Sequence, residues 1–268
     1  MTEDSTPPIL TNVEGGTGFI TLNRADRLNA FSLRLGEQFL AALRAFHEDD
    51  AVRAVVVRGV GRLFSVGGDV KEMLEGVEDG QDRAAYFRAP LTVFHEVVVA
   101  LRQMPKPVIA AVHGAVAGVA FNVMLACDLK VAAEGTRFTQ AFVKLGLSPD
   151  GGGTYFLPRL VGYARACELA MLPGEIDVRT ALSWGLVNWV VPADRLDAKV
   201  REIADRLAAG PTAALARAKR LLNGAYTGSL REQLDAERLA QIENAASRDF
   251  DEGLRAFVEK REPRFAGR

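Results

Sequence analysis

Two glycine-containing segments place backbone N–H groups where they could hold a negatively charged oxygen. Residues 64–70 read FSVGGDV and follow the β-branched run AVVVR, whereas residues 106–118 read KPVIAAVHGAVAG and end where a helix should begin. Glycine lets the backbone approach a ligand closely, and a helix N-terminus offers free N–H donors at the positive end of its dipole. The two segments together could form an oxyanion hole. Each segment alone also fits an ordinary turn into a helix.

A third segment could supply a carboxylate. Residues 146–154 read GLSPDGGGT, and Asp150 stands at the centre of this Pro-Asp-Gly sequence. Pro-Asp-Gly is a turn signature, and an aspartate there could cap the helix that follows. The same carboxylate could instead act as a general base. The pattern by itself favours the turn.

Few other residues have the types and spacing that catalysis or metal binding requires. His113 has a side chain that titrates near neutral pH, and it stands at the end of an apolar run. Cys127 and Cys167 are too few for a disulfide framework and indicate reduced, buried thiols of a cytoplasmic protein. No His/Cys cluster has metal-ligand spacing, so we predict no metal.

Composition limits the classes of protein to consider. The chain has 268 residues, of which 49% are hydrophobic and 25% charged, and its net charge is −1. This length suits one large α/β domain with an added subdomain, or two small domains. The near-zero net charge gives no field that would attract nucleic acid or an anionic membrane. The first residues lack the basic start and apolar run of a signal peptide, and we expect no transmembrane helix.

The order of elements predicts a layered α/β core. Apolar or β-branched runs at 9–13, 19–22, 54–58, 108–112 and 129–133 are typical of strands. Helical spacing follows Ser32 up to about residue 48, marks residues 94–101, and is expected over 115–127, while residues 71–88 look looser and more polar. After residue 193 only helical patterns occur. We therefore expect a core over 1–192 and a helical subdomain over 193–268.

Five ordered motifs carry a resemblance to a known family. They are LNRADRLNAFS at 22–32, FSVGGD at 64–69, KPVIAAVHGAVAG at 106–118, ACDLKVAA at 126–133 and GLSPDGGGTYFLPRLVG at 146–162. In these motifs the chain resembles the crotonase superfamily, the enoyl-CoA hydratase/isomerase family. The resemblance implies a spiral of ββα units and a C-terminal all-helical trimerisation subdomain. It also implies an acyl-CoA thioester substrate and a homotrimer or dimer of trimers.

The resemblance assigns the oxyanion hole to the backbone N–H groups of Gly68 and Val119. The family usually has glycine at the second position, so Val119 is a departure. A backbone donor tolerates a side chain when its dihedral angles stay in the ordinary regions. We therefore expect a working hole of altered shape.

The two glutamates of the hydratases are absent. Their positions fall on Asn122 and Phe142, and neither side chain can abstract a proton. Asp150 remains, at a turn where some isomerases of the superfamily carry their general base. The asparagine of FNVMLACD, the segment FTQAFVKLGL and PDGGGT most resemble the 1,2-epoxyphenylacetyl-CoA isomerase branch. This match favours Asp150 as a general base over Asp150 as a turn residue.

The combined interpretation is an acyl-CoA isomerase in which Asp150 moves a proton, shifting a double bond or opening a ring epoxide. By resemblance, Phe142, Met73 and Phe87 also contact the substrate, and Arg27 meets the coenzyme A phosphates. Asn122 is expected either to contact the substrate near the thioester or to pack its amide among the helices. Coenzyme A enters as part of the substrate, and no separate cofactor is expected. A hydratase that uses Asp150 with water and a non-catalytic acyl-CoA binding protein remain as alternatives.

Overall fold

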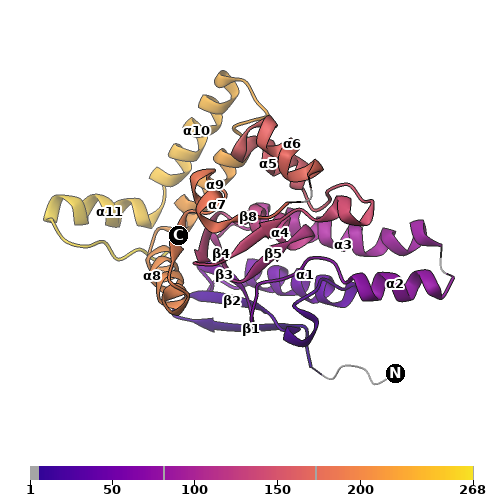
Figure 1. The fold of residues 1–268 in the computed structure, drawn as a ribbon. Helices are drawn as coiled ribbons and strands as arrows, with labels where there is room; N and C mark the ends of the chain where they lie inside the picture. The colour runs from indigo at the N-terminus through magenta and orange to yellow at the C-terminus, as the bar shows by residue number, and fades with distance from the viewer. Residues whose placement is uncertain (1–5, 81, 173, 268) are drawn as a thin grey trace.

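The computed structural model describes residues 6–80, 82–172 and 174–267. Its main sheet has six strands in the order β1-β2-β3-β4-β6-β9 (Figure 1). They are β1 (Ile9–Glu14), β2 (Thr17–Leu22), β3 (Ala54–Gly59), β4 (Val108–Val112), β6 (Leu129–Ala133) and β9 (Trp189–Val191). The β1–β2 hairpin is antiparallel, and all the other neighbours in this sheet are parallel.

A smaller sheet of three strands lies beside the first. It contains β5 (Ala115–Ala117), β7 (Arg137–Thr139) and β8 (Ile176–Asp177), with β7 in the middle. Strands β4 and β5 are followed in the chain by a helix. Strands β6 and β7 are followed by a short helix and then by a longer one. These strand–strand–helix units confirm the predicted layered α/β core.

Helices surround both sheets. The longer ones are α1 (Leu33–Glu48), α2 (Val70–Glu78), α3 (Arg83–Gln103), α4 (Gly118–Ala126), α5 (Gly153–Val161), α6 (Tyr163–Met171), α8 (Leu196–Ala208), α9 (Thr212–Gly224), α10 (Leu230–Ala245) and α11 (Arg248–Glu259). The shorter ones are η1 (Ala25–Arg27), η2 (Phe142–Leu145), η3 (Ala193–Arg195) and α7 (Val178–Ser183). As predicted, Ser32 begins α1, because its hydroxyl accepts a hydrogen bond from the Leu35 backbone.

The central strands of the main sheet are buried on both faces. Val55 and Val57 point toward the core that holds α1, α3 and α4, whereas Val56 points toward α8. Strands covered on both faces read as continuous apolar runs, which explains why the AVVVR segment shows no alternation. All nine residues of α4 are buried. This helix therefore forms the centre of the molecule.

Two predicted elements differ from the structure. The segment 71–88, expected to be loose, forms most of α2 and the first turns of α3. The expected helix over 115–127 is divided, because Ala115–Ala117 pairs as β5 and the helix starts only at Gly118. Tertiary pairing with β7 outweighs the helical propensity of these small residues.

By length and composition alone, one helix among the described residues is long and apolar enough to cross a membrane. It is α3, with a mean hydropathy of 1.2. In the fold α3 contacts α1 and α4, and its apolar face enters the core through Phe94, Val97, Val98 and Leu101.

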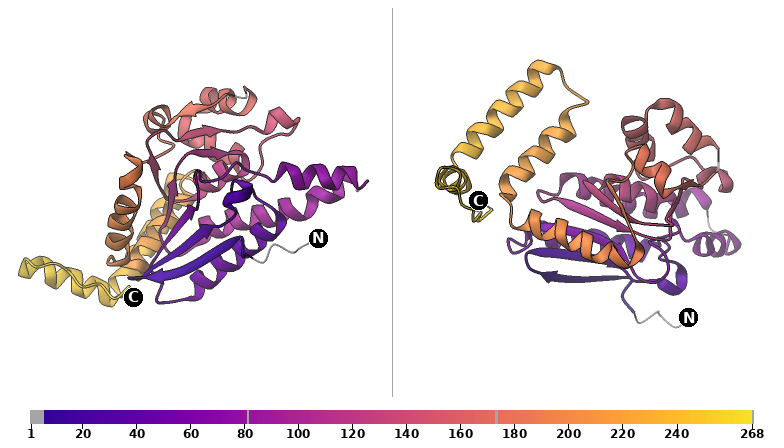
Figure 2. Two further views of the ribbon diagram at one scale, coloured as in Figure 1. Left: turned by 60° about the horizontal axis from the view of Figure 1, so that its bottom comes forward. Right: turned by 60° about the vertical axis from the view of Figure 1, so that its left-hand side comes forward.

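The C-terminal segment is all-helical, as predicted, but its helices differ in their relation to the core. Helix α8 covers one face of the main sheet with Leu196, Val200 and Ile203. Helix α10 contacts α9 and α11, and both α10 and α11 stand away from the sheets (Figures 1 and 2). The helices of 193–268 that stand away from the core therefore begin after α9, and the boundary at residue 193 stays a prediction.

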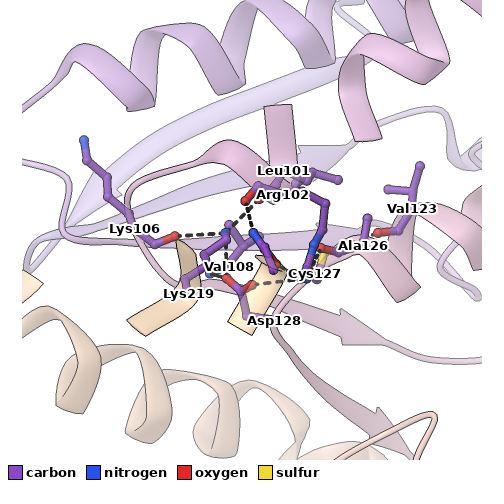
Figure 3. Close-up of polar contacts among 10 residues, drawn as sticks. Leu101, Arg102, Lys106, Val108, Val123, Ala126, Cys127, Asp128 and Lys219 are labelled. Atoms are coloured by element: carbon purple, nitrogen blue, oxygen red, sulfur yellow. Dashed lines mark hydrogen bonds and ion pairs between the residues drawn. The ribbon is translucent and has the colours of Figure 1, made fainter. Parts of the chain in front are cut away.

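Helix α9 is anchored to the core through Lys219 (Figure 3). The Lys219 ammonium lies 2.8 Å from the Asp128 carboxylate and donates a 2.7 Å hydrogen bond to the Leu101 carbonyl. Asp128 also accepts a 2.8 Å bond from the Val108 backbone. Asp128 thus ties α9 to the first residue of β4.

Candidate active site

A cavity of about 240 Å³ opens between α2, α3, the start of α4 and η2. Its wall is mainly apolar. The apolar lining comprises Phe31, Leu33, Val66, Val70, Met73, Phe87, Pro90, Leu91, Phe94, Val119, Ala141, Phe142, Leu145 and Leu147. The polar and glycine lining comprises Ser32, Gly68, Asp69, Glu72, Tyr86, Gly118, Gln140, Lys144 and Asp150. An apolar pocket with a few convergent polar groups is the usual form of a small-molecule site.

Gly68 and Val119 meet in the wall of this cavity because their two loops are joined by backbone hydrogen bonds. The Ser65 N–H donates to the Ala115 carbonyl, and the Ala117 N–H donates to the Ser65 carbonyl, both at 3.1 Å. Gly67 has a φ of +91°, and a Cβ there would lie 2.8 Å from the Ala117 carbonyl oxygen. Only glycine allows this approach, so the sequence Gly67-Gly68 fixes the distance between the two loops.

The start of α4 presents the second donor. Gly118 adopts a φ of +52° and begins the helix, which makes Val119 its second residue. The N–H groups of a first helical turn have no partner within the helix. Val119 itself lies outside the positive-φ region, so its side chain causes no backbone strain. The geometry agrees with a hole formed by the N–H groups of Gly68 and Val119, lying at the positive end of the α4 dipole.

Asp150 faces the same cavity without a structural task for its side chain. The residue that precedes α5 is Gly152, and no side chain caps that helix. Asp150 Oδ1 is buried and has no hydrogen-bond partner among the described residues. Burial raises the pKa of Asp150 to about 6, although His95 and the residue's own backbone N–H act in the opposite direction. Such a carboxylate is largely ionised at neutral pH and is a stronger base than an exposed aspartate.

Asn122 supports the loop that carries Asp150. Asn122 is fully buried, and its Nδ2 donates a 2.7 Å hydrogen bond to the Asp150 carbonyl. Its Oδ1 accepts a 2.9 Å bond from Gln140. A Cβ at Gly153 would lie 2.5 Å from Asn122 Nδ2, so the glycine run lets the loop approach α4. These contacts position the backbone on both sides of the carboxylate.

Comparison with known proteins identifies the family. The sequence profile described as Enoyl-CoA hydratase/isomerase matches residues 12–268. The chain belongs to the enoyl-CoA hydratase/isomerase family. It is 37% identical over 260 residues to the 1,2-epoxyphenylacetyl-CoA isomerase of Escherichia coli, covering 97% of this chain and 98% of that protein. A probable enoyl-CoA hydratase of Rhodobacter capsulatus is also 37% identical, over 96% of each chain.

Solved structures of the family share the fold. The crystal structure of a putative enoyl-CoA hydratase/isomerase from Mycobacterium abscessus superposes with a TM-score of 0.93 at 35% identity, over 97% of this chain and all of that one. The crotonase fold predicted from the sequence is thereby confirmed.

A further sequence relative is the trans-2-decenoyl-[acyl-carrier-protein] isomerase of Streptococcus mutans. It is 36% identical over 97% of this chain and 98% of its own length.

Most of the site residues predicted from the family motifs line one cavity. Gly68, Val119, Asp150, Met73 and Phe142 all contribute to its wall, as does Phe87. Met73 approaches closely, since a Cβ on Gly68 would lie 2.6 Å from Met73 Cε. These positions are compatible with the predicted oxyanion, base and acyl-binding roles.

Two predicted contact residues lie outside the cavity wall. Asn122, for which substrate contact and packing among the helices were both open, has a buried amide that supports the Asp150 loop from within the core. Arg27 is exposed in η1 and does not line the cavity, so its contact with coenzyme A phosphates stays a prediction. Neighbouring Arg24 pairs with Asp69 at 3.0 Å. The side chain of Asp69 also accepts a hydrogen bond from the Glu72 backbone and so caps α2 beside the Gly67-Gly68 loop.

Among the polar residues of the wall, Glu72 on α2 was not anticipated from the sequence, and it lies within the segment expected to be loose. The spacing Asp69-x-x-Glu72 is that of a helix N-terminus and could have indicated α2. His113 lies elsewhere, with Nε2 2.9 Å from the Gly61 carbonyl oxygen. Among residues 6–80, 82–172 and 174–267, no cluster of His, Cys, Asp and Glu could hold a metal ion.

Proposed function

We propose that this member of the family is an acyl-CoA isomerase with Asp150 as its general base. The thioester oxygen accepts hydrogen bonds from Gly68 and Val119 while Asp150 removes a proton from the α-carbon. The electron pair moves onto the thioester oxygen as an enolate. Asp150 then returns the proton at the γ-carbon, and the double bond becomes conjugated with the thioester. The observation that carries the proposal is the buried, unpartnered Oδ1 of Asp150 in the cavity wall.

Hydration is disfavoured because the cavity offers no second acid at the positions where the hydratases carry glutamate. Asn122 is 0% exposed and committed to Asp150 and Gln140, while Phe142 presents an aromatic ring. Adding water to a 2-enoyl-CoA needs one group that activates water and another that delivers a proton to the α-carbon. Moving a proton between two carbons of one substrate needs a single carboxylate. Asp150 alone can do this.

The names of the relatives support the class of reaction without selecting the acyl group. Two of them are named isomerases, for 1,2-epoxyphenylacetyl-CoA and for trans-2-decenoyl-[acyl-carrier-protein], and others are named hydratases. In the epoxide variant the same oxyanion hole would stabilise charge while the ring opens and rearranges. We propose coenzyme A as part of the substrate rather than as a separate cofactor, and a cytoplasmic location.

The test is turnover of three thioesters side by side. A 3-enoyl-CoA or a ring epoxide of phenylacetyl-CoA should be isomerised, whereas hydration of crotonyl-CoA should be very slow. Each missing acid or base group typically lowers a rate by about 10²–10⁴-fold. Hydration at the rate of an ordinary hydratase would contradict the proposal. Tight thioester binding without any turnover would favour a non-catalytic acyl-CoA binding protein.

A further inference from the structure

A second cavity, of about 390 Å³, lies between α9 and the core and shares no lining residue with the catalytic cavity. Most of its wall is apolar and comes mainly from α5, α8 and α9. The apolar side chains are Pro107, Leu125, Leu129, Phe156, Leu160, Leu207, Leu215, Ala218 and Leu222. The charged lining comprises four basic residues, Arg102, Lys130, Arg159 and Lys219, and one acid, Asp128. The wall therefore carries an excess of positive charge.

Three of the four basic residues already have partners. The Lys219 ammonium lies 2.8 Å from one oxygen of Asp128, and the Arg102 guanidinium lies 3.6 Å from the other (Figure 3). Arg159 is exposed, stacks 3.7 Å over the Tyr155 ring and donates a 2.8 Å hydrogen bond to the Tyr155 carbonyl. Asp128 is thus shared by Lys219 and Arg102, and its charge is compensated without the fourth basic residue.

The fourth basic residue, Lys130, is buried in this wall without a partner. It is 7% exposed, and no hydrogen bond or ion pair joins its ammonium group to any described residue. Side chains alternate along a strand, and Val131 faces α8, so Lys130 faces the side of β6 on which α4 and α5 lie. Its register partner Ala110 on β4 belongs to that same face. A buried ammonium group without an anion is costly, so the cavity lacks a negative charge.

The charge and the wall together select a class of ligand. One ammonium group without a partner matches a single negative charge, and the long apolar wall matches a hydrocarbon or aromatic body. A phosphate ion would turn most of its oxygen atoms toward carbon. We propose that the second cavity binds a carboxylate with an apolar body, a fatty acid or an aromatic acid, and that Lys130 bonds the carboxylate. This site is independent of the reaction proposed above, because Lys130 lies outside the catalytic cavity.

Isothermal titration of octanoate into the full-length protein tests this site. The comparison ligands are 1-octanol, which lacks the charge, and inorganic phosphate, which lacks the apolar body. We expect octanoate to bind saturably and about tenfold or more tightly than 1-octanol, as one charge-assisted hydrogen bond allows, and inorganic phosphate should not displace it.

Lys130→Met keeps the length of the side chain and removes its charge, so it should weaken octanoate binding by about tenfold or more. Lys130→Arg should retain most of the affinity, because the guanidinium can bond a carboxylate. The urea midpoint of the unliganded Lys130→Met protein should be at least that of wild type, since the change removes a buried charge without a partner. Weaker binding by this variant would then not reflect unfolding.

Lys144→Met is the matched control, since Lys144 lines the catalytic cavity and not the second one. It should bind octanoate as the wild type does. Loss of binding in this control would place octanoate in the catalytic cavity and overturn the inference. Equal affinity for octanoate and 1-octanol, displacement by inorganic phosphate, or wild-type affinity in Lys130→Met would also overturn it. A wild type that does not bind octanoate, with sedimentation altered in Lys130→Met, would show that a second copy of the chain fills the cavity instead.

Discussion

The carboxyl group of Asp150 is held in conditions that make it a stronger base than an aspartate in water. Its Oδ1 is withdrawn from solvent, and no donor among the described residues bonds to it. The pKa of about 6 that burial produces lies close to the working range of a general base at neutral pH. Because Oδ1 of its buried carboxylate lacks a hydrogen-bond donor, ionised Asp150 makes the folded protein less stable. Activity and stability are therefore expected to respond in opposite directions to its replacement.

Asp150→Asn should abolish isomerisation and leave thioester binding nearly unchanged. The amide keeps the size of the side chain but cannot accept a proton. We expect turnover of a 3-enoyl-CoA to fall by about 10²–10⁴-fold, with the dissociation constant of a saturated acyl-CoA within about threefold of wild type. Asp205→Asn, an exposed change on α8, is the control and should have no effect. A variant that keeps wild-type turnover would show that the base lies elsewhere.

Asp150→Asn should also stabilise the protein at high pH. The folded-state pKa of Asp150, about 6, is above its ordinary value of 3.8, so the folded chain binds this proton more tightly than the unfolded chain does. Wild-type stability therefore falls as the pH rises from about 4 to about 6, by up to about 3 kcal/mol. The asparagine variant lacks this loss.

Urea unfolding of both proteins at pH 4.5 and pH 8 measures this effect, because the wild-type midpoint can be compared with that of the variant at each pH. The gain of the variant over wild type should be larger at pH 8. Equal differences at both pH values would mean that Asp150 is not desolvated in the folded protein.

At the scale of elements, the site depends on the Gly68 loop, the start of α4 and the Asp150 loop. The loop of Gly68 pairs with β5, α4 begins at Gly118, and the Asp150 loop rests on Asn122. Because Asn122 lies within α4, one short helix carries both the proposed second oxyanion donor and the support for the proposed base. The distance between these two groups is therefore set by a rigid element rather than by a loop.

Asn122→Ala should reduce turnover more than binding. The change leaves the buried Asp150 carbonyl and the Gln140 amide without their partner, which typically costs about 1–3 kcal/mol of stability. The Asp150 loop should become less well positioned, so we expect kcat to fall by about 10–100-fold with a smaller change in KM. Steady-state kinetics and urea unfolding measure the two effects.

Asn122→Asp offers a comparison of equal size that loses the Nδ2 donor. It should lower kcat as well, since only an amide donates to the Asp150 carbonyl. Unchanged kcat in both variants would argue against a positioning role for Asn122.

Local sequence patterns predict the elements that are determined by nearby residues. The Ser32 cap of α1 and the strand over 54–58 both depend on neighbours in sequence, and both were expected. The start of α2 was missed although Asp69 and Glu72 have the spacing of a helix N-terminus. The environment of Asp150 depends on α3, α4 and η2, which lie far apart in the chain. Its role could be expected only through the family motifs.

The whole molecule divides into a packed core and an extended pair of C-terminal helices (Figure 2). Lys219 attaches α9, the helix that precedes this pair, to the core by its ion pair with Asp128, and Arg102 lies 3.6 Å from the same carboxylate. Removing one member of a buried pair is usually more damaging than removing both, because it leaves a buried charge unpaired. The joint therefore holds α9 firmly, and the two helices that follow it are presented to solvent from a fixed base.

The outer helices expose apolar side chains that a monomer would leave in water. On α11 Phe257 is 83% exposed, Val258 72% and Leu254 53%, and on α10 Leu230 is 76% exposed. Clustered apolar side chains of this kind usually mark a protein–protein interface. The occupant that suits both helices is a second copy of the chain, and the family resemblance predicts a trimer or a dimer of trimers.

We therefore expect sedimentation at micromolar concentration to give a trimer or hexamer and no stable monomer. Phe257→Glu should shift the protein toward monomers, because a charge would be buried in the interface without a partner. Glu259→Gln, which by helical spacing lies on the side of the same helix opposite to Phe250 and Leu254, should leave the assembly unchanged and serves as the control. The core is complete without α10 and α11, so the dissociated variant should still unfold cooperatively. A wild-type protein that sediments as a monomer would show that these helices serve some other contact.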